Sequence, residues 1–267
     1  MSRIKQTFEK LATDNKTVLI PFITAGDPHP DHTVSFMHAL VEGGADILEL
    51  GVPFSDPMAD GPVIQHSSER ALKHNVSLAD VMSMVQEFRK ENQTTPVVLM
   101  GYCNPIEIMG YDKVVKQAAE VGVDGILTVD LPPEEAVSFN AQLNSSGVDP
   151  VFLIAPTSTE ERIKKICSSA TGFVYYVALK GVTGSSELDT SGIKSKLDLI
   201  RKHTNLPVGA GFGIKNGETA ASVAKVSDAV VVGSALVSKM EALMDQPEKI
   251  ADEVQHFMAE LRSAIDK

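Results

Sequence analysis

Two acidic residues stand where a carboxylate could transfer or attract protons. Glu49 interrupts a short apolar run between Leu48 and Leu50, and Asp60 follows in a loop rich in glycine and proline that ends at Pro62. A carboxylate inside an apolar strand is costly to desolvate, so we expect Glu49 either to be paired or to lie where a pocket opens. Two carboxylates in different surroundings can divide the roles of acid–base catalysis between them.

Two glycine-rich stretches near the C-terminus favour a binding site for a phosphate group. Residues 209–213 read GAGFG, and Gly233 and Ser234 follow the next apolar run. Glycine lets backbone N–H groups approach a phosphate closely, and a helix N-terminus adds a favourable dipole. Residues 181–184, which read GVTG, are a third candidate. Ordinary strand-to-helix turns also favour glycine. In enzymes built as a (β/α)8 barrel, however, the loops after the last two strands commonly bind phosphate.

Other kinds of catalytic site find little support. The sequence has no GxSxG or Ser-His-Asp arrangement, and Lys180, just beyond an apolar run, is only weak support for an imine mechanism. The seven histidines show no spacing typical of metal ligands, so no metal site is predicted. Tyr102 and Tyr175 lie at predicted strand ends, where aromatic rings can either wall a pocket or fill a barrel interior.

The composition fits a cytoplasmic protein with an ample core. The chain has 267 residues, of which 43% are hydrophobic, and its net charge of -11 argues against nucleic acid as a partner. No apolar run approaches the ~20 residues that span a membrane. The N-terminal pattern of Ile4, Phe8 and Leu11 predicts an amphipathic helix rather than a signal peptide. Cys103 and Cys167 lack CxxC spacing, which fits a reducing compartment.

Apolar runs alternate with helical patterns after this first helix. We expect strands within residues 18–28, 46–51, 96–105, 124–133, 150–158, 172–179, 206–214 and 228–237. We expect helices within residues 31–42, 63–73, 78–91, 111–121, 134–144, 160–168, 193–203, 216–224 and 247–265. Near-continuous apolar strands are typical of a parallel sheet that is covered on both faces. Eight strand–helix units in about 250 residues predict a (β/α)8 TIM barrel with an extra N-terminal helix, as a single domain over residues 1–267. A doubly wound open sheet is the alternative.

The longest interval between strands separates the second strand from the third. It holds the loop from Pro53 to Pro62 and an additional helix. An insertion after a barrel strand falls on the face where active sites form, which favours a catalytic role for Glu49 and Asp60.

Seven motifs give the chain a close resemblance to the tryptophan synthase α chain family over nearly its whole length. The most specific is LELGVPFSDPMADGPVIQ at residues 48–65. The others are PFITAGDP (21–28), MGYCNP (100–105), DLP (130–132), GVTG (181–184), VGAGFGI (208–214) and VVVGSA (230–235). The resemblance implies a TIM barrel that cleaves indole-3-glycerol phosphate to indole and glyceraldehyde 3-phosphate, a retro-aldol step in tryptophan biosynthesis that needs no cofactor in this chain.

The same resemblance implies roles for individual residues. Glu49 would be the acid–base for the proton transfers, and Asp60 would accept a hydrogen bond from the indole N–H. Thr183 would help to close the loop after the sixth strand against Asp60. The indole pocket would be formed by Phe22, Ile64, Met100, Tyr102, Leu127 and Tyr175. The substrate phosphate would be held by Gly184, Gly211, Phe212, Gly213, Gly233 and Ser234.

A partner is implied as well. It is a pyridoxal-phosphate β chain in an α2β2 heterotetramer, which would receive indole through a tunnel, with Pro57 and Asn104 as expected contact positions. One departure is visible: many family members have a Ser-Arg pair before GVTG, where this chain has Ala178-Leu179-Lys180. Closure of that loop is therefore expected to differ, while the catalytic pair is intact.

Two alternatives remain open from the residues. Another phosphate-binding barrel enzyme, such as a sugar-phosphate isomerase or aldolase, would need a different acid–base set or a Schiff-base lysine. A non-enzymatic binding subunit would keep the phosphate site but would not need both Glu49 and Asp60.

Overall fold

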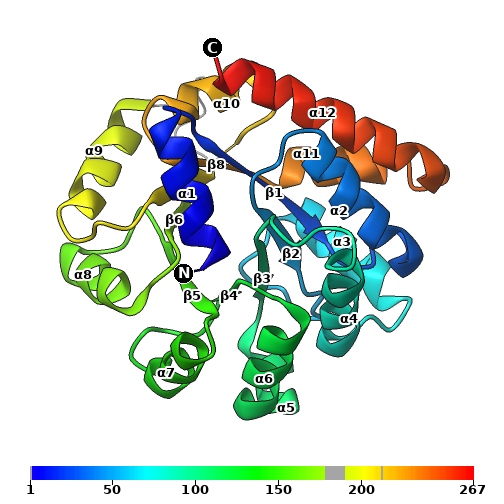
Figure 1. The fold of residues 1–267 in the computed structure, drawn as a ribbon, viewed down its shortest axis with the longest axis horizontal. Helices are drawn as coiled ribbons and strands as arrows, with labels where there is room; N and C mark the ends of the chain where they lie inside the picture. Colours follow the sequence, from blue (N-terminus) through cyan, green and yellow to red (C-terminus); the bar gives the residue numbers. More distant parts are fainter. Residues whose placement is uncertain (1, 178–189, 212) are drawn as a thin grey trace.

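Eight parallel strands close into a barrel in the computed structural model, which describes residues 2–177, 190–211 and 213–267 (Figure 1). Each strand pairs with the next along the chain, and β8 pairs with β1. The strands are β1 (Val18–Thr24), β2 (Leu48–Gly51), β3 (Val97–Gly101), β4 (Gly125–Thr128), β5 (Asp149–Ile154), β6 (Val174–Val177), β7 (Val208–Gly211) and β8 (Ala229–Val232). The predicted TIM barrel is confirmed, and the open sheet is wrong because the first and last strands are hydrogen-bonded.

The helices after α1 follow the strands and form the outer layer. Side-chain caps begin several of them, because a side-chain oxygen satisfies a backbone N–H that has no partner in the first turn. The capping residues are Ser2, Ser77, Thr159 and Asn216. The α-helices are α1 (Arg3–Thr13), α2 (Thr33–Glu42), α3 (Pro62–Leu72), α4 (Leu78–Phe88), α5 (Cys103–Met109), α6 (Tyr111–Val121), α7 (Val137–Ser145), α8 (Glu160–Ser169), α9 (Thr190–Arg201), α10 (Gly217–Ala224), α11 (Ser234–Glu241) and α12 (Ile250–Ile265). Two short 3-10 helices, η1 (Pro30–His32) and η2 (Pro247–Lys249), precede α2 and α12.

Two of these helices correct the predicted elements. Residues 103–105 begin α5 rather than ending the third strand, and the Cys103 N–H donates to Asp130 Oδ1 at 2.7 Å. Pro105 is compatible with this short helix because its missing N–H falls in the first turn. Residues 234–237 begin α11, although the apolar run suggested a continuous strand. A short apolar run has no periodicity that separates a strand from a buried helix.

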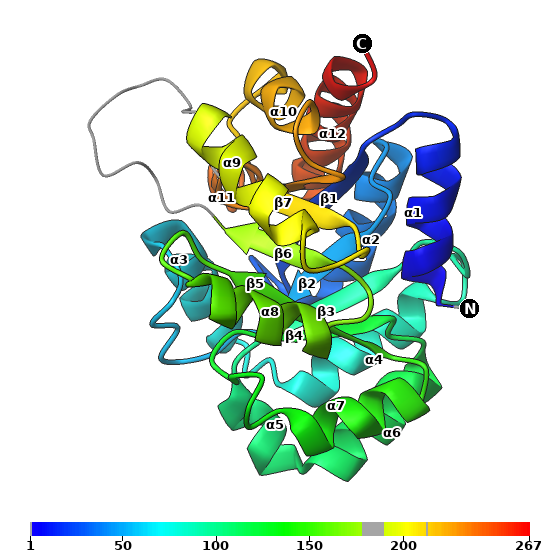
Figure 2. The ribbon, with the colours of Figure 1, turned by 90° about the vertical axis from the view of Figure 1, so that its left-hand side faces the viewer.

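The barrel interior is filled by side chains that alternate along the strands. They form one apolar cluster with two residues of α1: Ile4, Phe8, Val18, Ile20, Ile47, Val98, Leu127, Val151, Phe173, Ala229 and Val231. The rings of Phe8 and Phe173 lie 5.8 Å apart between centroids. The predicted N-terminal helix therefore closes one end of the barrel, where Figure 2 shows α1 beside the strands. Since side chains alternate between the two faces of a strand, the apolar strand side chains that do not point into the barrel pack under the outer helices.

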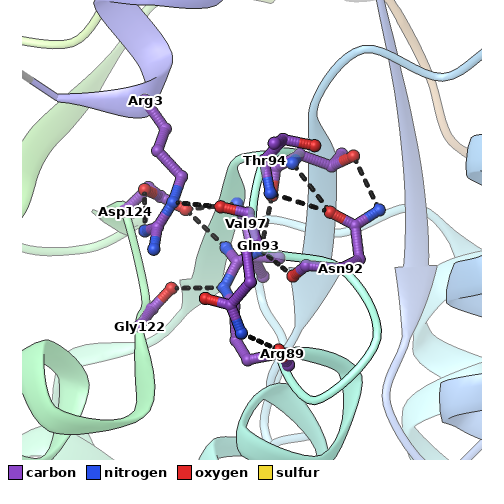
Figure 3. Close-up of polar contacts among 9 residues, drawn as sticks. Arg3, Arg89, Asn92, Gln93, Thr94, Val97, Gly122 and Asp124 are labelled. Carbon is purple, nitrogen blue, oxygen red and sulfur yellow. Dashed lines mark hydrogen bonds and ion pairs between the residues drawn. The ribbon is translucent and has the colours of Figure 1, made fainter.

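An ion-pair network fastens this closed end (Figure 3). Asp124 precedes β4, and its carboxylate accepts from Arg3 of α1 at 2.8 Å and from Arg89 at 2.7 Å. Arg89 also donates to the carbonyl oxygens of Thr95 and Gly122. Both Arg89 and Asp124 are buried, and their bonds join α1, α4 and the starts of β3 and β4.

The C-terminal helix α12 packs against α2 and α10 (Figure 1). In the sequence, the helical spacing of Ile250, Val254, Phe257, Leu261 and Ile265 predicts one apolar face, and in the structure the first four are buried and Ile265 is half-buried. Among the described helices, none has the length and apolar character needed to cross a membrane. The assignment of residues 1–267 to a single domain stays a prediction.

Candidate active site

Glu49 is a buried acid at the open end of the barrel. It lies in β2 opposite Phe22 of β1, and only 2% of the residue is exposed. Its Oε1 atom has no hydrogen-bond partner among the described residues. Burial raises the pKa of Glu49 to about 8, with a smaller contribution from the negative charge of Asp60. The carboxyl is therefore mostly protonated at neutral pH, a condition that suits a general acid.

Asp60 lies in the loop between β2 and α3, and Tyr102 fixes its position. The Tyr102 hydroxyl donates to Asp60 Oδ2 at 2.9 Å and accepts from the Ala59 N–H at 3.0 Å. Gln65 of α3 donates to the Asp60 carbonyl oxygen at 2.9 Å. Burial raises the pKa of Asp60, while the hydrogen bond from Tyr102 favours the charged form and opposes that rise. Tyr102 thus fixes the carboxylate of Asp60 on the wall of the site, and Gln65 fixes its backbone.

A cavity of about 690 Å³ brings the two acids together. Ten of the predicted site residues line it: Glu49, Asp60, Phe22, Ile64, Met100, Tyr175, Gly211, Gly213, Gly233 and Ser234. They come from β1, β2, β3, β6, β7, the β2–α3 loop, α3, the residues after β7 and the start of α11. Their convergence at the carboxyl ends of the strands is the arrangement expected of a barrel active site.

Tyr175 lies within β6 rather than at its end, and its partner in the neighbouring strand β7 is Gly209. Burial and the nearby carboxylates of Glu49 and Asp60 raise the pKa of its hydroxyl, which therefore stays protonated. A Cβ atom at Gly211 would lie 2.4 Å from the Tyr175 hydroxyl oxygen. Glycine at this position of β7 is thus what allows the tyrosine ring to lie across the neighbouring strand.

The predicted phosphate end of the cavity is formed by backbone. Gly213 has a φ of +54°, which favours glycine, and no atom lies within 4 Å of the position that a Cβ would take. Gly233 is the N-cap of α11, and Ser234 is the first residue of that helix. The positive end of the α11 dipole therefore points toward an open space in the cavity, where an anion would be stabilised.

Some predicted residues do not line this cavity. Leu127 is fully buried in the interior cluster below it, and Tyr102 acts through Asp60 while its ring stacks on Phe54. Thr183, Gly184 and Phe212 lie outside the described residues, as do residues 178–180.

Sequence reasoning missed several residues of the cavity wall. Leu153 and Val231 follow Val151 and Ala229 by two positions along their strands, so the period of a β-strand could have placed them on the inner face. Ser238 lies one helical turn beyond Ser234 and so on the same face of α11. This relation could not be predicted, because residues 234–237 were expected to form a strand. Lys215 is a further polar residue of the wall, and it directly follows the motif VGAGFGI (208–214).

A model of the family described as "Tryptophan synthase alpha chain" matches residues 8–266. The chain belongs to the tryptophan synthase α chain family. A relative of that name from Paraburkholderia phytofirmans is 59% identical over 266 residues, which cover 100% of this chain and 98% of the relative. As an α chain the protein is a lyase subunit of tryptophan biosynthesis that cleaves indole-3-glycerol phosphate. This finding sets aside both the other barrel enzymes and a purely binding role.

Solved structures agree with this assignment. The α subunit of tryptophan synthase from Legionella pneumophila is 45% identical, with a TM-score of 0.93 and coverage of 100% of this chain and 99% of that chain. A chain of tryptophan synthase from M. tuberculosis in an open form is 32% identical, with a TM-score of 0.88 and 99% of both chains covered. Membership of the α chain family indicates a β chain as partner.

Proposed function

We propose that Glu49 carries out both proton transfers of the cleavage, with Asp60 stabilising the charge that develops on the indole nitrogen. The observation that carries this proposal is the state of Glu49, which is buried, faces the cavity and has a pKa raised to about 8. A carboxyl group that is protonated at neutral pH can begin as an acid, and the carboxylate left after the transfer is a base.

The reaction starts with the transfer of the Glu49 proton to C3 of the indole ring. The electron pair of the C2–C3 double bond forms the new C–H bond, and the ring nitrogen becomes positively charged. The Glu49 carboxylate then accepts the proton of the hydroxyl group on the carbon attached to C3. The released O–H electrons form the aldehyde C=O, the C–C bond breaks, and its electrons restore the neutral indole ring.

Asp60 acts where the charge appears. Its carboxylate would accept a hydrogen bond from the indole N–H, which becomes a stronger donor as the nitrogen becomes positive. Preorganised charge of this kind is most effective in a site that excludes water. The hydrogen bonds from Tyr102 and Gln65 hold Asp60 in place before the substrate binds, so little reorganisation is needed.

The substrate spans the cavity from its apolar side to its glycine-rich side. Phe22, Met100 and Tyr175 would surround the indole ring, while Gly213, Gly233 and Ser234 would bind the phosphate through backbone N–H groups and the α11 dipole. The two ends of the substrate thereby position the bond to be broken beside Glu49, which is a catalytic contribution in itself.

The partner would bind at the same face of the barrel. Asn104 is exposed in the first turn of α5 and Pro57 is half-buried in the β2–α3 loop, and both lie beyond the carboxyl ends of their strands. We place the β chain there, in a cytoplasmic α2β2 heterotetramer in which the β chain holds pyridoxal phosphate and receives the indole. Contact with this loop would also let the partner influence Asp60.

Indole release from indole-3-glycerol phosphate by the purified chain tests the proposal. Glu49→Gln should reduce turnover by about 10²–10⁴-fold while substrate binding is kept. Asp60→Asn should lose most of the activity, whereas Asp56→Asn, an exposed position in the same loop, should lose little. Near-wild-type turnover of Glu49→Gln would rule out its role in proton transfer, and an inactive Asp56→Asn would point to damage of the loop instead.

A further inference from the structure

The cavity has an uneven balance of charge for a substrate that carries a phosphate group. Its described wall contains two acidic residues, Glu49 and Asp60, and a single basic residue, Lys215. The whole chain has a net charge of -11. A phosphomonoester is largely dianionic near neutral pH, so the Asp60 carboxylate and the acidic surface both disfavour its approach. Backbone N–H groups supply only partial charges.

Lys215 lies beside the predicted phosphate end, two residues after Gly213. Its backbone is fixed, because the Lys215 N–H donates to Thr219 Oγ1 at 2.9 Å and Ile214 before it is buried. Thr219 in turn belongs to the capping box that begins α10. The cavity wall therefore presents this residue from a structured turn between β7 and α10.

The Lys215 side chain is exposed, and no carboxylate of the described residues lies within 4.0 Å of its ammonium group. Some other lysines are paired, such as Lys194 at 2.8 Å from Asp198 and Lys239 at 2.6 Å from Glu253, whereas Lys215 combines an ammonium group that is unpaired among the described residues with a place on the cavity wall. A lysine that lines a cavity without an internal partner keeps its full charge for a ligand.

We propose that Lys215 is a specificity-determining residue that pairs its ammonium group with the phosphate of the substrate. This inference rests on the proposed function, because it assigns the cation to the phosphate end of the same site. Lys215 adds the full positive charge that the glycine-rich backbone lacks. It makes the site select a dianionic phosphate over a neutral or singly charged group, and it takes no part in the proton transfers at Glu49.

Two measurements on Lys215→Met test this inference. The first is the KM and kcat for indole release, and the second is calorimetric titration with inorganic phosphate and, separately, with indole. We expect the KM for indole-3-glycerol phosphate and the Kd for inorganic phosphate to rise about tenfold, with kcat and the affinity for indole unchanged. Lys215→Arg should restore both constants. The matched control is Lys225→Met, an exposed lysine at the end of α10 that does not line the cavity.

The possible outcomes distinguish a failure of the role proposed for Lys215 from a failure of the proposed function. Unchanged KM and phosphate affinity in an active Lys215→Met enzyme would overturn the role of Lys215 alone. An equal loss of indole and phosphate binding, or a loss of kcat without a change in KM, would also overturn it, because either result indicates a structural effect. If the wild-type chain released no indole, the proposed function would fail, while the phosphate titrations of Lys215→Met and Lys225→Met would still decide whether Lys215 binds an anion.

Discussion

The acid role proposed for Glu49 depends on its surroundings rather than on its residue type. The sequence showed a carboxylate in an apolar strand, which fits either a paired or a catalytic glutamate, and the long insertion after that strand favoured the catalytic role before the family motifs were considered. The structure adds that Oε1 has no partner among the described residues and that burial raises the pKa to about 8. Neither fact can be read from neighbours in the chain, because the atoms that exclude water come from other strands.

This raised pKa has a consequence for stability. Between the unfolded value of 4.5 and the folded value of about 8, the folded chain keeps a proton that the unfolded chain loses. The contribution of Glu49 to stability is therefore present below pH 4.5 and is lost as the pH rises toward 8, by up to about 1.4 kcal/mol per pH unit. Glu49→Gln removes this dependence.

We expect the free energy of unfolding of Glu49→Gln to rise relative to wild type as the pH increases from 5 to 8. Urea unfolding at a series of pH values measures this difference. Parallel curves for the two proteins would mean that the carboxyl of Glu49 is not desolvated in the folded chain.

At the closed end of the barrel, three pairs of strands are linked by the same arrangement of an aspartate and an arginine. Asp46, Asp124 and Asp228 each precede an even-numbered strand, and each accepts a backbone N–H at 2.8 Å from the preceding strand of the barrel. Each also pairs with an arginine: Arg262, Arg89 and Arg201 respectively. The three aspartates are visible in the sequence before apolar runs, but their arginines are distant in the chain, so the pairing could not be predicted.

The degree of burial determines which of these ion pairs contributes most to the stability of the fold. The Arg89 and Asp124 side chains are 7% and 4% exposed, whereas those of Arg201 and Asp228 are 36% and 43% exposed. Asp124→Asn leaves a buried cation without its partner and should cost about 3–5 kcal/mol of stability. Asp228→Asn, at the equivalent place before β8, should cost less than about 1 kcal/mol.

Chemical unfolding of both variants measures their free energies of unfolding and so checks this prediction. Activity at low temperature should be kept in both, because the network lies at the end of the barrel opposite the cavity. Equal stabilities of the two variants would show that the Arg89–Asp124 pair is not what fastens α1 and α4 to the barrel.

The periodic features of the fold were predictable, and the local ones were not. The eight apolar runs and the face of Ile250, Val254, Phe257 and Leu261 followed directly from hydrophobic periodicity. Helices α5 and α11 were missed because a short apolar or proline-containing segment has no clear period. Nine of the ten predicted cavity residues lie in the family motifs and Tyr175 lies outside them, while Leu127 lies in the interior cluster rather than on the cavity wall. Depth depends on register between strands, which a single sequence does not specify.

The whole molecule presents large apolar side chains at the face that contains the site. Ile108 of α5 is 82% exposed, Met58 of the β2–α3 loop is 78% exposed, and Val137 of α7 is 67% exposed. They follow three successive strands, β2, β3 and β4, so they lie around one side of the cavity entrance. Exposed apolar side chains that gather on one face are typical of a protein–protein interface.

Ile108→Asp should therefore weaken binding of the β chain at least tenfold and abolish its effect on turnover, while the isolated chain keeps its basal rate of indole release. Met244→Asp is the matched control, because Met244 is also exposed but follows α11 on another part of the surface. Titration of each variant with the β chain measures the affinity. If both variants bound the β chain equally well, the partner would not bind at this face.

The pH dependence of kcat/KM for indole release tests the central claim most directly, because that claim assigns the first proton transfer to a protonated Glu49. Since burial raises its pKa to about 8, the fraction of enzyme able to donate falls above that pH. We predict an alkaline limb with an apparent pKa near 8, along which kcat/KM falls about tenfold per pH unit. A value of kcat/KM that stays constant or rises between pH 7 and pH 10 in a folded enzyme would contradict the account.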